Sequence, residues 1–110
     1  MAKGTFLGEF ELYVMLALAR LGPEAYGVTI RQEIERRAGR DVAIGAVYAT
    51  LARLEAKGLV RHQLSDPQPI QGGRARKYFR LTPPGERALA HSTAMLARMM
   101  QGWRPRTQST

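Results

Sequence analysis

Between residues 44 and 60, apolar side chains recur every three or four positions, and this spacing predicts a helix. The apolar stripe consists of Ile44, Val47, Tyr48, Leu51 and Leu54. The opposite face is small at its start, carries a hydroxyl in the middle and ends in positive charge. That face consists of Ala46, Ala49, Thr50, Arg53 and Lys57. Gly58 follows at the position where a glycine typically ends a helix.

The polar face of this helix has two interpretations. Its small first turns can approach a partner closely while its later turns supply cations, which suits the major groove of DNA and its flanking phosphates. The alternative is an ordinary amphipathic helix with a solvated outer face. Tyr48 has the spacing of a core residue, and we expect it in the core, although its hydroxyl is long enough to reach a phosphate.

Two more helices are predicted before this one. Residues 7–21 are apolar on two faces, so this helix needs burial on most sides. That burial could come from a central place in one subunit, but together with the last helix we favour burial by a second subunit. Gly22-Pro23 then turns the chain. Residues 24–38 form the second helix, in which Glu33 and Arg37 are predicted to make a weak surface pair. Residues 41–43 are predicted to form a short bridging strand.

After the third helix the pattern changes to two short strands, over residues 59–65 and 77–82. The prolines and glycines of the intervening DPQPIQGGRAR exclude ladder pairing and indicate an exposed loop. Three cations gather at the end of this loop: Arg74, Arg76 and Lys77. Two strands with a basic loop, directly after a helix with a basic end, are typical of a wing.

The last predicted helix is capped by Thr82, starts with Pro83 and runs to about Gly102. It carries an apolar seam with a seven-residue repeat and neighbouring methionines. The residues expected in this seam are Leu89, Met95, Leu96, Met99 and Trp103. The seam could pack onto its own subunit, but we favour a dimer interface, because small domains commonly bury such a seam in a twofold dimer.

The net charge of +8 is unevenly distributed along the 110 residues. Residues 1–42 hold six basic and six acidic side chains, whereas residues 43–80 hold seven basic and two acidic ones. The surplus therefore follows the third helix and the wing, and it favours a polyanionic partner, with nucleic acid ahead of a membrane surface. The length suits one domain. We expect a cytoplasmic protein, because the start is not a signal peptide and no apolar run is long enough to span a membrane.

The sequence offers little for catalysis. It has no cysteine, which excludes disulfides and thiolate metal sites. His62 and His91 have no second ligand at a spacing that suits a metal, and no Ser, His and Asp constellation is present. We therefore expect neither an enzyme nor a bound metal or cofactor.

The order of these elements, together with four motifs, resembles the winged helix-turn-helix regulators of the PadR family. The motifs are GEFELYVMLAL, Tyr26-Gly27, AVYATLARLEAKGLV and GGRARKYFRLTPPGERAL, which span about Gly8 to Leu89. The resemblance implies a mainly α fold with a small β-wing. Residues 1–82 would form the DNA-binding domain with its three-helix core and two-stranded wing, residues 83–103 the C-terminal dimerisation helix, and residues 104–110 a disordered tail.

The resemblance also implies a function, that of a homodimeric repressor whose third helices enter successive major grooves of a palindromic operator. Near base edges we expect Ala46, Ala49 and Thr50, with Arg53 and Lys57 on phosphate or guanine. On the wing, Arg74, Arg76 and Lys77 would meet backbone or minor groove. Family members often have a proline where this chain has Ala49, so base contacts of relatives do not carry over to that residue.

A second hypothesis concerns the methionine-rich last helix and Trp103. The single short C-terminal helix resembles the compact branch of the PadR family. The resemblance implies that the dimer axis can leave an apolar cavity, and these side chains suit flat aromatic or cationic guests. The alternative is that these side chains only pack against one another in the core of the dimer. Quenching of Trp103 fluorescence by planar cationic dyes would support a small-molecule-sensing dimer. A third reading, nonspecific chromosome packaging, fits the dimer seam and the modest charge less well.

Overall fold

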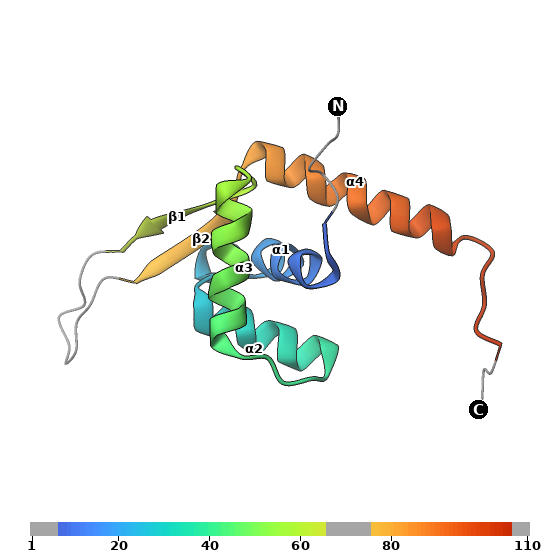
Figure 1. The fold of residues 1–110 in the computed structure, drawn as a ribbon, viewed down its shortest axis with the longest axis horizontal. Coiled ribbons are helices and arrows are strands. Elements are labelled where there is room, and N and C mark those ends of the chain that lie inside the picture. Colours follow the sequence, from blue (N-terminus) through green and yellow to red (C-terminus); the bar gives the residue numbers. More distant parts are fainter. Residues whose placement is uncertain (1–6, 66–75, 107–110) are drawn as a thin grey trace.

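The computed structural model describes residues 7–65 and 76–106, and Figure 1 shows them as a helical body with a two-stranded wing. Its elements are α1 (Glu9–Leu21), the 3-10 turn η1 (Gly22–Glu24), α2 (Gly27–Ala38), α3 (Ile44–Ala56), β1 (Val60–Leu64), β2 (Lys77–Leu81) and α4 (Pro83–Met100). The predicted class, mainly α with a small β-wing, is confirmed. The bridging strand predicted at 41–43 is wrong. There, the backbone N–H of Val42 donates to the Glu35 carboxylate at 3.0 Å, so a side chain satisfies it instead of a strand.

Helix α1 is the centre of the core. Val14 and Met15 are fully buried, and α1 packs against α2, α3, β2 and the start of α4. Most of the burial that its two apolar faces require therefore comes from the same subunit. Leu16 is the large apolar side chain of α1 that stays exposed. The side chains that α2 and α3 contribute to the same cluster are Ile30, Ile34, Val47, Leu51 and Leu54.

The wing is an antiparallel pair in which His62 lies opposite Phe79. The backbone N–H of Phe79 donates to the carbonyl of Ala25 at 2.9 Å, and Tyr78 forms an isolated bridge with Tyr26. Phe79 is buried, whereas its neighbours Tyr78 and Arg80 are not, so β2 turns one side toward the core. The base of the wing is thus fixed to the start of α2.

Thr82 caps α4 as predicted. Its hydroxyl accepts the N–H of Gly85 at 3.0 Å and donates to the carbonyl of Gly58 at 2.6 Å, so the cap also holds α4 to the end of α3. The first two turns of α4 bury one face in the body, and the helix then leaves it (Figure 1). Leu89, expected in the dimer seam, is instead buried in the core of its own chain, and that expectation is corrected.

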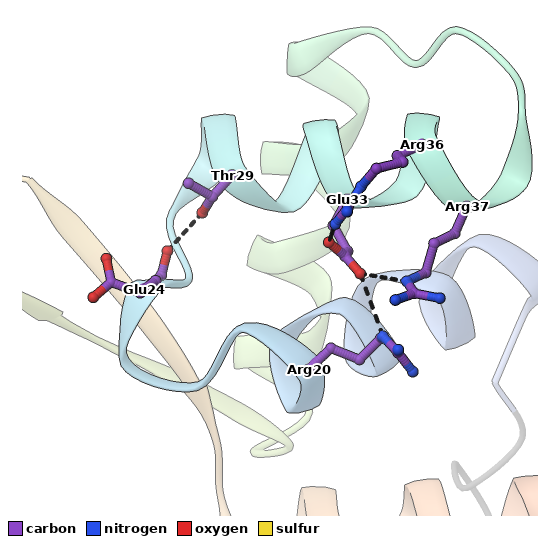
Figure 2. Close-up of polar contacts among 6 residues, drawn as sticks. All are labelled: Arg20, Glu24, Thr29, Glu33, Arg36 and Arg37. Carbon is purple, nitrogen blue, oxygen red and sulfur yellow. Dashed lines mark hydrogen bonds and ion pairs between the residues drawn. The ribbon is translucent and has the colours of Figure 1, made fainter.

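Glu33 joins α1 to α2. Its predicted pair with Arg37 is present, but the Glu33 side chain is buried rather than on the surface. Its buried carboxylate receives Arg37 Nε at 2.6 Å, Arg20 Nε of α1 at 3.3 Å and the guanidinium of Arg36 (Figure 2). Hydrogen bonding by Arg37 comes first among the causes that hold the pKa of Glu33 below its ordinary value of 4.5. Three cations around one carboxylate form a network between two helices.

We expect Glu33→Gln to destabilise the protein at neutral pH and to matter less in acid. A carboxylate whose pKa is lowered by folding stabilises the folded state above its ordinary pKa, and that contribution is lost as the pH falls below 4.5. Thermal unfolding of both proteins above and below this pH measures the effect. Glu24→Gln is the control, since the Glu24 carboxylate points away from the network in Figure 2. A constant difference between Glu33→Gln and wild type across pH would contradict the assignment.

Candidate nucleic-acid interface

Helix α3 presents one face to solvent, and this face is rotated from the one that the sequence predicted. Its centre consists of Gly45, Ala49, Ala52 and Ala56, all exposed and spaced four, three and four residues apart. Along one edge lie Ala46, Arg53 and Lys57, which are also exposed. Gly45, Ala52 and Ala56 were missed, although the same helical spacing, started one residue earlier, identifies them.

Thr50 does not lie on this face, so its predicted position is wrong. It is 2% exposed and counts among the fully buried side chains of the core. At 100° per residue it points a quarter turn or more away from Ala49, toward the side that Val47 and Leu54 bury. Its hydroxyl accepts Arg53 Nη2 at 3.0 Å, so Thr50 orients a cation of the exposed edge.

The two cations of α3 share one carboxylate on α1. Lys57 Nζ lies 3.0 Å and Arg53 Nε 3.7 Å from Glu11 Oε2, while Glu11 Oε1 accepts the backbone N–H of Gly8 at 2.9 Å. Burial acts to raise the pKa of Glu11, but the Gly8 hydrogen bond and the two cations outweigh it and lower the pKa below 4.5. The carboxylate is therefore ionised at neutral pH and holds both cations near α1.

Tyr48 marks the opposite edge of α3, and its expected place in the core is wrong. Its side chain is among the exposed large apolar groups, with the residue 44% exposed. Its ring crosses the first residue of α2, so that a Cβ on Gly27 would lie 2.2 Å from the Tyr48 hydroxyl oxygen. The Tyr26-Gly27 motif thus has a steric reason, namely room for the tyrosine of α3.

At the end of β2 nearest the loop, Arg76 is held by two tyrosines. Its guanidinium lies 4.2 Å from the ring centroid of Tyr26, and its Nη1 donates to the Tyr78 hydroxyl at 3.3 Å. Lys77 beside it is exposed. Arg74, the third predicted wing cation, lies outside the described residues. Figure 1 shows both strands projecting beside α3.

The described part of the chain offers no group of three or more side chains suited to a metal ion. His62 Nδ1 instead lies 2.7 Å from the carboxylate of Glu55, at the last turn of α3. Within residues 7–65 and 76–106, no helix is long and apolar enough to cross a bilayer.

Comparisons with known proteins agree with this arrangement. Residues 15–91 match the transcriptional regulator PadR-like family. The chain is 41% identical over 73 residues to the transcriptional regulator Rv3488 of Mycobacterium tuberculosis, an alignment that covers 66% of this chain and 64% of the relative. It is also 39% identical over 90 residues to an uncharacterized 37.1 kDa protein in transposon TN4556 of Streptomyces fradiae, covering 79% of this chain but 24% of that protein.

Solved structures show the same fold. A PadR-like transcription factor from Bacteroides fragilis superposes with a TM-score of 0.71 at 29% identity, over 84% of both chains. A PadR family transcriptional regulator from Eggerthella lenta gives a TM-score of 0.63 at 30% identity, over 84% of this chain and 82% of that one. With its three-helix core, two-stranded wing and matched sequence, the chain belongs to the PadR-like family of winged-helix transcriptional regulators.

Proposed function

We propose that this protein is a homodimeric repressor that binds a palindromic operator, with α3 of each copy in the major groove. The observation that carries the proposal is the exposed face of α3. A strip of glycine and alanine, with cations along one edge, can lie closer to base edges than a face of long side chains. Transcriptional regulation is the activity of the family, and a cytoplasmic location belongs to the proposal.

Base readout and phosphate contact divide between the centre and the edges of this face. The alanine methyl groups, including that of Ala49, suit apolar contact with thymine methyl groups. Ala46 lies near the N-terminal end of the edge, and Arg53 and Lys57 further along it have the charge to bind phosphate or guanine. Thr50 is not part of this set, because it is buried.

The wing supplies a second contact outside the major groove. Arg76, fixed over Tyr26, and the exposed Lys77 lie at the end of β2 nearest the loop. Cations at such a position bind sugar-phosphate backbone or the minor groove without reading the major-groove pattern. We propose the same role for Arg74.

The course of α4 supports the proposed dimer. Gly85, Ala88 and Leu89 bury one face of this helix in the body, and the same face continues beyond the body with nothing in the described chain to cover it. The exposed continuation of this face on α4 consists of Met95, Leu96 and Met99, with Met100 beside them, and the exposed Trp103 follows just beyond the end of the helix. We propose that the α4 seam, as we name these five residues, pairs with its copy about a twofold axis and sets the distance between the two α3 helices.

A glutamate in the centre of the α3 face tests this function. Ala49→Glu places negative charge against base acceptors and phosphates, so we expect at least a tenfold loss of affinity, since like charges across an interface cost several kcal/mol. The measurement is fluorescence anisotropy on a labelled duplex selected by the wild-type protein from a random library. Ala90→Glu, on the exposed side of α4, is the matched control. Equal affinity of Ala49→Glu and wild type would reject α3 as the reading element.

The small-molecule hypothesis remains a second proposal. Its support is that Trp103 is 61% exposed and Met99 77% exposed, which leaves aromatic and thioether surface at the place where two copies of α4 would meet.

A further inference from the structure

Glu11 contacts the cations of the DNA-facing helix without belonging to that helix. It is 46 residues away from Lys57 in sequence, yet its Oε2 receives Lys57 Nζ at 3.0 Å and lies 3.7 Å from Arg53 Nε. The carboxylate and the two cations differ in their exposure to solvent. The Glu11 side chain is 10% exposed, whereas those of Arg53 and Lys57 are 57% and 36% exposed. A duplex can therefore reach the cations but not the carboxylate.

These contacts give the two cations an internal alternative to phosphate. If Lys57 turned fully toward a phosphate, Glu11 would remain nearly buried with one fewer positive partner, and a buried charge that loses a partner is costly. Arg53 is held twice, by Glu11 and by the hydroxyl of Thr50 at 3.0 Å. Moving either cation from Glu11 to a phosphate therefore costs free energy, which its contact with DNA must offset.

We propose that Glu11 is a specificity-determining residue, an internal counter-ion that limits how many phosphates α3 engages on any duplex. The proposal rests on the proposed function, DNA binding through α3. Nonspecific binding derives almost wholly from phosphate contacts, whereas binding to an operator also draws on base contacts. Holding back two cations therefore weakens nonspecific binding more than specific binding and widens the difference between them.

Glu11→Gln tests this role with little change in shape. The glutamine amide oxygen can still accept the Gly8 N–H, but the charge that retains Arg53 and Lys57 is gone. Glu9→Gln is the matched control, since it removes the same charge from the same turn of α1, where the carboxylate accepts only the hydroxyl of Tyr13 among the contacts of the described residues. Binding to a random-sequence duplex is measured by anisotropy at several salt concentrations.

For Glu11→Gln we expect tighter binding to random duplex, roughly three- to tenfold at low salt, and a plot of log affinity against log salt that is steeper by about 0.9 for each cation released. Glu9→Gln should keep the wild-type slope. For a duplex selected as operator, the gain in affinity should be smaller, so the ratio of specific to nonspecific affinity falls.

A second variant does not depend on how well Glu11→Gln folds. In the otherwise wild-type chain, Lys57→Gln should lower the salt slope by clearly less than the roughly 0.9 of an unrestrained phosphate contact. A full decrease, or equal slopes for Glu11→Gln, Glu9→Gln and wild type, would overturn this inference alone. If wild type and all variants fail to bind duplex, both this inference and the proposed function are rejected.

Discussion

Replacing Leu96 with glutamate will turn the protein into monomers and lower its affinity for operator DNA by about 100-fold, since two linked reading helices gain 10²–10⁴ in avidity over one. Leu96 lies at the centre of the α4 seam and is exposed in the single chain, so its own subunit does not need it for folding. In a twofold dimer each glutamate would meet apolar side chains and, near the axis, its own copy.

The oligomeric state is measured by sedimentation and the affinity by anisotropy on the selected duplex. Ala94→Glu is the matched control, because Ala94 lies on the opposite side of the same helix and carries the same charge change. The control should stay dimeric and bind as wild type. A dimeric Leu96→Glu protein would show that the α4 seam does not hold the subunits together.

Gly85→Ala will lower the free energy of unfolding by about 3 kcal/mol, at the upper end of what overpacking usually costs. A Cβ at this position would lie 1.9 Å from the backbone carbonyl oxygen of Leu59, which no side-chain rotation can relieve. The start of α4 would have to move away from the backbone of Leu59, and the Thr82 cap would move with it. Thermal unfolding should show a decrease of at least about 10 °C in Tm.

Gly45→Ala is the comparison for this effect, because Gly45 is also a helical glycine without positive φ and has open space where a Cβ would be. It should unfold at the wild-type temperature or slightly above, since alanine favours a helix over glycine by up to about 1 kcal/mol. Equal stability of Gly85→Ala and wild type would show that α4 does not pack on Leu59 at this distance.

The sequence was sufficient to predict the elements because hydrophobic spacing and turn residues are local signals. The helices, the two strands and the Thr82 cap all follow from residues a few positions apart. The phase of α3 was wrong by about one residue. Thr50 is small and polar, so the sequence pattern is compatible with it on either the buried or the exposed face of α3. Its burial depends on how α1 and α2 pack against α3.

Contacts between distant residues account for most of what the sequence did not reveal. Nothing near Glu33 in the sequence indicates that Arg20 of α1 reaches it, and nothing near Lys57 indicates Glu11. Tyr48 was expected in the core because it lies at the spacing of the apolar stripe of α3, yet it packs across Gly27 and stays partly exposed. Such partners are decided by how the helices cross, which one sequence does not state.

The α4 seam was likewise predicted from the sequence only in part. Its repeat correctly predicted an apolar stripe, but not where along the helix the body ends. Leu89 lies before that point and is buried, whereas Leu96 lies beyond it and is exposed. The part of the repeat that is free to bind a second copy is therefore shorter than the sequence suggested.

The most direct test of two α3 helices reading one operator is the stoichiometry and footprint of the complex. Sedimentation of the protein with its selected duplex should give two chains per duplex, and hydroxyl-radical cleavage should show two symmetric protected regions about one helical turn apart. One chain per duplex, or a single protected region without symmetry, would contradict the account.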